Sequence, residues 1–289
     1  LTAFNNRLTA GFDFYIKKTS DLLVPANWSA LAGSASKPSI NIGDMKNRGV
    51  DLSIGWRDKV GEFGYNITAN FSRYKNEVTR LGSSDLFNST RLSKVNITTV
   101  GQPVGMFYGY VVDGIYQSED DVKAYGVLPY GVSTQDDLDP SAWVGRYKLK
   151  DVNGDGKIDV DDRTIIGNPH PDLSGGINIG LTWRDFDLST YMYYSIGNDL
   201  YKHYEYYTMF GNLQSNYAKD RLATSWDPIN NPTGTYPMWT TTSGEGAEAG
   251  NESNSNYVQD GSYLRMQTLT LGYSLPKKLL KKIGFEKVR

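Results

Sequence analysis

An acidic stretch at residues 151–162 has the residue types and spacing best suited to chemistry. Its sequence is DVNGDGKIDVDD, which matches the calcium-loop pattern D-x-[DN]-x-[DN]-G. Oxygen ligands at alternate positions suit Ca²⁺, and Gly156 at the sixth loop position allows the sharp turn that points them inward. The predicted ligands are the side chains of Asp151, Asn153, Asp155, Asp159 and Asp162 and the main-chain carbonyl of Lys157.

The expected role of this calcium loop is structural. Position 12 is Asp162, where such loops usually have a bidentate Glu, and the flanking sequence does not form a helix pair. We therefore expect one isolated turn in which Ca²⁺ orders a long connection. The alternative is an acidic turn that binds no metal.

Aromatic side chains form a second candidate site. Tyr204, Tyr206 and Tyr207 lie close together in one predicted loop, and Trp226 and Trp239 follow in the same loop. Tyr and Trp beside Asn and Asp bind sugars through ring stacking and hydrogen bonds, although the same residues are also common in protein contacts. We expect these five residues to contact substrate.

The composition excludes most other chemistry. The 289 residues include no Cys and two His, and no nucleotide-binding, hydrolase or zinc-protease motif is present. The 30 basic and 32 acidic residues nearly cancel, so the sequence gives no sign of a nucleic-acid partner. No run reaches the roughly 18 apolar residues of a transmembrane helix. We therefore predict a β protein that is not an enzyme.

The elements that must position these residues are strands. Six segments alternate apolar and polar residues, which indicates strands with one apolar and one polar face. They are residues 8–18, 50–56, 63–72, 177–183, 186–196 and 268–275. A soluble antiparallel sandwich follows the same rule and is the simplest alternative.

The lengths of the connections favour a membrane barrel. Short turns at 56–62, 183–186 and 275–284 alternate with long connections at 19–48, 75–172 and 198–261. A transmembrane barrel has short periplasmic turns on one side and long extracellular loops on the other. Aromatic residues flank each short turn, as in an interfacial girdle.

The predicted fold is therefore all-β: a transmembrane antiparallel β-barrel with long extracellular loops. Residues 1–289 would form the C-terminal portion of one barrel domain, and residues 76–172 a long extracellular excursion that contains the acidic loop. The chain begins with Leu1 and stops in a strand-like segment, so we expect part of a longer protein.

Several stretches together resemble one family. They are GYVVDGIYQ at 109–117, DVNGDGKID at 151–159, DRTIIGNPHPD at 162–172, GG at 175–176, FDLS at 186–189, DGSYLR at 260–265 and TLGYSLP at 270–276. In this order they resemble the C-terminal part of the barrel of SusC/RagA-type TonB-linked outer membrane proteins. Met266 departs from the pattern, since the family often has a basic residue there.

The resemblance implies a 22-stranded barrel in the outer membrane of a Gram-negative bacterium, with a plug domain that is not in this chain. It implies import driven by TonB–ExbB–ExbD and capture of substrate by a SusD-like surface lipoprotein. Family substrates are mostly oligosaccharides, so oligosaccharide import is the leading hypothesis. The alternatives are peptide import by the same kind of transporter and an extracellular calcium-stabilised β-sandwich that binds or hydrolyses carbohydrate.

Overall fold

The chain forms two compact units in the computed structural model. The structure describes residues 1–25, 39–82, 85–88, 92, 94–210, 216–239, 252–276, 284–286 and 288–289. Unit 1 comprises residues 1–82, 170–198 and 260–289, and unit 2 comprises residues 83–169 and 199–259. Most of the predicted basic turn after residue 275 lies outside the described residues. In the described part of the chain, no helix is long and apolar enough to cross a bilayer.

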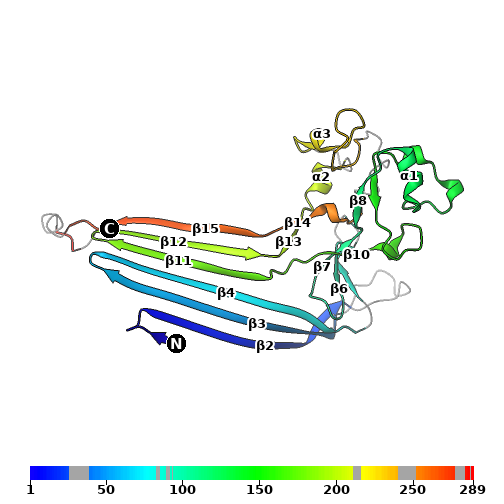
Figure 1. Ribbon diagram of the computed structural model, residues 1–289. Helices are drawn as coiled ribbons and strands as arrows, with labels where there is room; N and C mark the ends of the chain where they lie inside the picture. Colours follow the sequence, from blue (N-terminus) through cyan, green and yellow to red (C-terminus); the bar gives the residue numbers. More distant parts are fainter. Residues whose placement is uncertain are drawn as a thin grey trace. The chain divides into compact units, whose positions relative to one another are not determined.

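Unit 1 is one antiparallel sheet of seven strands in the order β1-β2-β3-β4-β11-β12-β15. Figure 1 shows the long strands lying side by side. The strands are β1 (Thr2–Ala3), β2 (Leu8–Pro25), β3 (Ser39–Val60), β4 (Phe63–Arg80), β11 (Leu173–Trp183), β12 (Phe186–Ile196) and β15 (Tyr263–Tyr273). This confirms the prediction of a mostly β, antiparallel fold.

The register of the sheet gathers the apolar residues on one face. Phe12 lies opposite Leu52, which lies opposite Phe71 on the next strand. Large apolar side chains on this face are solvent-exposed, for example Leu269 at 61% and Leu271 at 72%. Because side chains alternate along a strand, the opposite face carries mainly polar residues, such as Thr68, Asn178 and Thr268.

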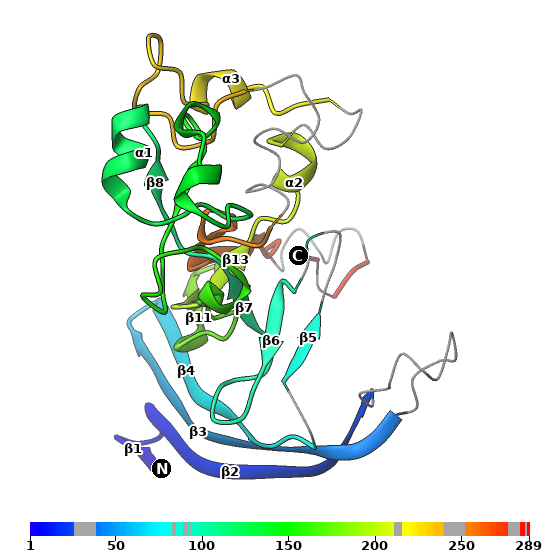
Figure 2. The same ribbon diagram turned by 90° about the vertical axis from the view of Figure 1, so that its right-hand side faces the viewer.

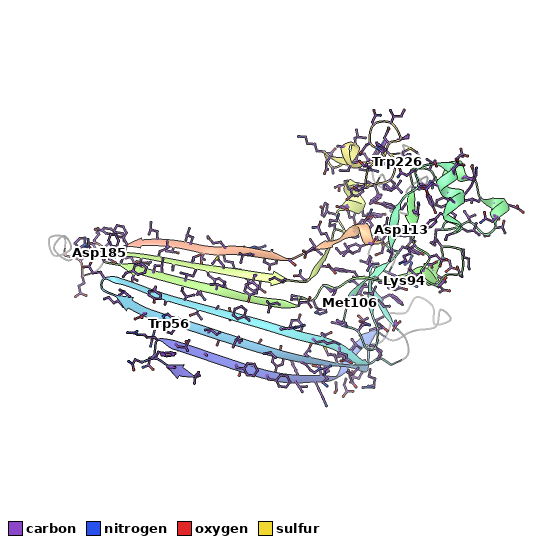
Figure 3. All side chains as sticks on the ribbon, in the orientation of Figure 1. Trp56, Lys94, Met106, Asp113, Asp185 and Trp226 are labelled. Atoms are coloured by element: carbon purple, nitrogen blue, oxygen red, sulfur yellow. The ribbon has the colours of Figure 1, made fainter. Side chains whose placement is uncertain are left out.

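Aromatic residues line up in one row at the turn end of unit 1. Phe63 lies opposite Trp183, Trp183 opposite Phe186, and Phe186 opposite Tyr273. The Phe186 and Tyr273 rings are 4.7 Å apart. Asp185, labelled in Figure 3, lies in the tight turn between β11 and β12. The sequence predicts this grouping of aromatic residues at the short turns, and the register adds that they share one row.

The prediction that residues 19–48 form a long connection is wrong for residues 19–25 and 39–48, which belong to strands. Strand β2 continues to Pro25 and β3 begins at Ser39. Their pairing passes through Lys18 opposite Lys46 and Thr19 opposite Met45, where apolar alternation has ended. Backbone hydrogen bonds hold a ladder together without apolar side chains, so the sequence pattern ends before the strands do. Strand β4 likewise extends to Arg80, beyond the predicted start of the excursion at residue 76.

Unit 2 is built from short strands and helices around its own core (Figure 2). One sheet has the order β10-β7-β6-β5, and β8 pairs with β9 and β13 with β14. The strands are β5 (Leu86–Asn88), β6 (Asn96–Thr98), β7 (Met106–Gly109), β8 (Val112–Ile115), β9 (Tyr147–Leu149), β10 (Thr164–Gly167), β13 (Asp199–Tyr201) and β14 (Val258–Asp260). The α-helices are α1 (Glu119–Tyr125), α2 (Glu205–Thr208) and α3 (Arg221–Thr224).

The core of unit 2 joins residues that are far apart in the sequence. Its buried members are Leu92, Val95, Tyr110, Ile115, Tyr147, Leu149, Ile158, Met209, Phe210, Trp226 and Tyr257. Both long excursions contribute to it. Two stretches that the sequence predicts as separate loops therefore fold together as one packed body.

Candidate functional sites

The acidic loop folds as a tight turn fixed by its first carboxylate. Asp151 accepts hydrogen bonds from the main-chain N–H groups of Gly154 at 2.6 Å and Gly156 at 2.8 Å. The bond from Gly156 and other main-chain N–H groups lower the pKa of Asp151. Gly154 and Gly156 have φ values of 78° and 86°, a backbone region that favours glycine. The sequence of the loop thus specifies its turn.

The end of the loop is anchored in the core of unit 2. Ile158 is buried, and its N–H donates to the carbonyl of Leu128 at 2.8 Å. Asp162 is fully buried and accepts from the N–H groups of Val152 and Asp159, each at 2.8 Å. These contacts bring the first and last predicted ligands close together, as a closed cation loop requires.

The carboxylates of the loop are bound by groups of the chain itself. Lys157 donates to Asp159 at 2.6 Å, and this ammonium lowers the pKa of the Asp159 carboxyl. Asp155 accepts from the N–H of Lys157 at 3.1 Å. Across the residues the structure describes, no three His, Cys, Asp or Glu side chains are grouped so that they could hold a metal ion. Calcium binding at Asp151, Asn153, Asp155, Asp159 and Asp162 with the Lys157 carbonyl stays a prediction.

Three of the five predicted substrate aromatics lie on or beside helix α2. Tyr204 is 61% exposed and precedes the helix, while Tyr206 and Tyr207 lie within it. The rings of Tyr206 and Tyr207 meet edge to face with centroids 5.1 Å apart, and His203 stacks on Tyr206 at 6.1 Å. The structure thus places these residues together with His203, which the sequence analysis did not single out.

The two tryptophans occupy different environments. Trp226, labelled in Figure 3, is 2% exposed, and its indole N–H donates to the side-chain oxygen of Gln117 at 2.8 Å. A buried ring cannot stack on a sugar, so the burial of Trp226 argues against its predicted contact with substrate. Trp239 is half-buried and packs edge to face on Tyr217 at 4.6 Å, with the Arg221 guanidinium 5.2 Å from its ring.

The polar face of unit 1 carries a further candidate surface. Thr68, Asn178, Tyr191 and Thr268 lie in one row across four strands and line a shallow hollow. The Tyr191 ring lies against Gly176, where a Cβ atom would come within 2.6 Å of a ring carbon. The glycine therefore lets the tyrosine lie flat along the sheet. Alternation alone predicts the polar face, but only the pairing register shows which residues share the row.

Two ion pairs in unit 2, each with one buried partner, are not predicted by the sequence. The Lys202 ammonium donates to Glu205 at 2.7 Å, and Arg163 pairs with Glu252. The partners in the first pair are three residues apart, but those in the second are 89 apart. Charged residues in a loop are usually solvated, so nothing in the local sequence distinguishes these from surface charges.

Comparison with known proteins identifies the class to which the chain belongs. No family model matches it. The TonB-dependent receptor P3 of Formosa agariphila is 33% identical over 99% of this chain and 27% of its own length. The TonB-dependent receptor SusC of Bacteroides thetaiotaomicron is 27% identical over 93% of this chain and 24% of its own. The chain spans about a quarter of the length of these relatives.

Solved structures agree with these relatives. The RagAB peptide importer in its closed-closed state matches with a TM-score of 0.71 and 25% identity, over 96% of this chain and 28% of that chain. Its open-open state matches with a TM-score of 0.68 at 25% identity, over 96% and 27% of the two chains. Both results favour a receptor fold over the extracellular β-sandwich.

The chain is part of a TonB-dependent receptor of the outer membrane, and it belongs to the SusC/RagA family. Receptors of this class are transport proteins and not enzymes. These findings confirm the predicted family, the outer-membrane location and the assignment as a non-enzyme.

Proposed function

We propose that the complete protein imports oligosaccharides across the outer membrane. In this proposal unit 1 contributes wall strands to a 22-stranded barrel, with its exposed apolar face toward lipid. Unit 2 contributes extracellular loops. TonB–ExbB–ExbD supplies the energy, and a SusD-like lipoprotein delivers the substrate. The similarity to SusC and to RagAB supports the transport class and the partner.

The residues that line the hollow in unit 1 support oligosaccharide rather than peptide as the cargo. The row of Thr68, Asn178, Tyr191 and Thr268 consists of neutral amide and hydroxyl groups beside one aromatic ring. Such groups suit neutral sugars, whose hydroxyls both donate and accept hydrogen bonds. Asp187 is the one charged residue that lines the hollow in the described part of the chain, and Arg289 binds it at 2.8 Å. A peptide with charged termini would find no free counter-charge among the described lining residues.

Growth experiments on the full-length receptor test this cargo. A strain that lacks the receptor is complemented with the wild type, with Asn178→Leu or with Ile179→Leu. The two altered residues are neighbours on β11 that face opposite sides of the sheet. Oligosaccharide-dependent growth should fall with Asn178→Leu and stay unchanged with Ile179→Leu. Loss of growth on peptides alone, with every glycan still used, would instead assign peptide cargo.

We also propose that the loop at 151–162 binds Ca²⁺ as a structural ion. The oxygen spacing and the closure of the loop through Asp162 support this proposal. Calorimetric titration of the purified receptor with CaCl₂ tests it. Asp155→Ala should remove the binding isotherm, whereas Lys157→Met should tighten binding because it removes a cation that competes for Asp159. Equal titrations for wild type and Asp155→Ala would refute the proposal.

A further inference from the structure

The apolar face of unit 1 ends in a cluster of basic residues. The cluster lies on strands β2, β3 and β4, at the end away from the short turns. Its side chains share the face of Phe12, Leu52 and Phe71, because side chains alternate along each paired strand. Its members, called the basic cluster below, are Lys18, Lys46, Arg48, Arg73 and Lys75. Charges on the apolar face of a barrel strand need an explanation, since the polar residues of such strands usually face the lumen.

The pairing register places like charges of the basic cluster directly opposite one another. Lys18 lies opposite Lys46, and Arg48 lies opposite Lys75. Like charges in such positions destabilise a sheet. Glu77 lies opposite Lys46 and forms an ion pair with Arg48 at 3.3 Å. The other four members form no ion pair within the described part of the chain. The cluster therefore carries positive charge that the described protein groups do not neutralise.

A hollow beside Lys18 and Lys46 has the donors that an anion requires. Hydroxyl side chains also line it, namely those of Thr19, Ser20 and Thr79. Among the described lining residues the one acid is Asp44, and Arg80 donates to both of its carboxylate oxygens, at 2.7 and 3.0 Å. Ammonium and hydroxyl groups are donors that bind phosphate oxygens. The hollow is therefore suited to a phosphate group.

The position of the basic cluster along the strands matches the level of lipid headgroups. Strand β4 runs from Phe63, at the short turn, to Arg73 over about ten residues, or roughly 33 Å. In a barrel whose strands tilt by about 40°, this is about 25 Å along the axis. The apolar band of a transmembrane barrel is also about 25 Å tall. The cluster therefore begins where the acyl chains of the bilayer end.

The cluster and the apolar side chains next to it together define one occupant. We propose that the basic cluster binds the phosphate groups of a lipid in the outer leaflet, whose acyl chains lie on Phe14 and Ile16. These two side chains are 62% and 52% exposed. The outer leaflet is the one at this end, because the short turns of such barrels face the periplasm. A free phosphate ion would leave the apolar side chains uncovered.

Lipid binding by the full-length receptor tests this proposal. Native mass spectrometry follows a titration of the receptor in detergent with bisphosphorylated lipid A, and with the same lipid after removal of its phosphates. The wild type should bind the phosphorylated lipid roughly tenfold or more tightly than the other. Lys18→Gln combined with Lys75→Gln should weaken this binding roughly tenfold, because each basic residue near an anionic lipid contributes severalfold to affinity. Equal binding of the two lipids by the wild type would overturn the proposal.

A matched double variant controls for the total charge. Lys17→Gln combined with Lys59→Gln removes two cations from the opposite face of β2 and β3 and should leave lipid binding unchanged. An equal loss of binding in both double variants would show that net charge, and not the basic cluster, attracts the lipid. Release of the lipid by millimolar inorganic phosphate would assign the cluster to a free anion. Either result would overturn the proposal.

A spin label separates this proposal from the proposed function. The proposal rests on the lipid-facing placement of unit 1 in that function, and not on the cargo. A nitroxide is attached to the receptor through Phe12→Cys, on the apolar face. If oxygen reaches the label more readily than a water-soluble nickel chelate does, the face meets lipid, and failure to bind lipid A then refutes the basic cluster alone. A label reached mainly by the chelate would overturn both the lipid-facing placement and this proposal.

Discussion

Replacing Trp226 by Ala should open unit 2 while leaving the sheet of unit 1 intact. The indole is 2% exposed and donates to Gln117 at 2.8 Å, so the substitution leaves both a large cavity and an unbonded amide oxygen. Gly145 and Gly234 approach this residue so closely that a Cβ on either would come within 2.8 Å of it. Deleting a buried Trp side chain costs about 3–5 kcal/mol. Local opening of unit 2 should then increase roughly a hundred- to several-thousand-fold.

Hydrogen exchange on the full-length receptor measures this opening. Amides of the core of unit 2, such as those of Trp226 and Tyr236, should exchange much faster in the variant. Amides in the paired strands β11 and β12 should keep their wild-type rates, because they belong to the other compact unit. Trp239→Ala is the matched control: its ring is half-buried, so the increase in exchange should be smaller.

The same variant tests whether Trp226 supports the core of unit 2, as its burial indicates, or contacts substrate, as the sequence predicts. If Trp226 stacks on substrate, Trp226→Ala should reduce uptake with little change in exchange. If it supports the core, uptake should fall only together with faster exchange. Loss of uptake at wild-type exchange rates would therefore show that Trp226 contacts ligand and that our assignment to the core is wrong.

Three further predictions concern the sheet, the loops and a close contact. Leu269→Lys should cost about 2–4 kcal/mol of barrel stability in lipid and deplete the assembled receptor on heat-shift gels, whereas Thr268→Lys on the polar face should assemble normally. Burial alone would raise the pKa of Asp121, but hydrogen bonds from Lys148 at 2.8 and 3.1 Å leave it lowered. The stability from this pair is present above about pH 4 and lost as pH falls through the lowered pKa, so proteolysis of unit 2 should rise in acid, and less steeply in Asp121→Asn. Gly49→Ala should slow assembly because its Cβ would lie 2.3 Å from the facing Tyr15 ring, and Tyr15→Ala should restore the rate.

The sequence predicts the strands of unit 1 where alternation is unbroken. Residues 63–72 and 186–196 show it, and both lie in long strands of the sheet. Alternation specifies faces because period two is a property of the strand itself. It does not specify length: β2 and β3 stay paired through Lys18 and Lys46, where apolar alternation has ended. The row of aromatics at the short turns was also predictable, because turn position and residue type are both local.

The acidic loop was predictable for the same reason. The turn at Asp151 depends on Gly154 and Gly156, and all three residues lie within one short stretch. The burial of Asp162 and the packing of Ile158 depend on distant partners in the core, and no local pattern reports them. Calcium binding does not follow from the turn alone, because the Lys157 ammonium is hydrogen-bonded to Asp159, one of the predicted ligands.

The aromatic residues of the long connections show why a candidate site is harder to predict than a strand. Tyr206, Tyr207 and Trp226 look equivalent in sequence, since each is a large ring among polar neighbours. A long connection that folds as its own unit must first fill a core, and aromatic rings supply the most buried area per residue. Trp226 is therefore buried in the core with Tyr257, whereas Tyr204 is exposed. Burial therefore decides whether an aromatic residue packs in the core or can contact ligand. In unit 2 this burial depends on contacts between two excursions that are distant in the chain.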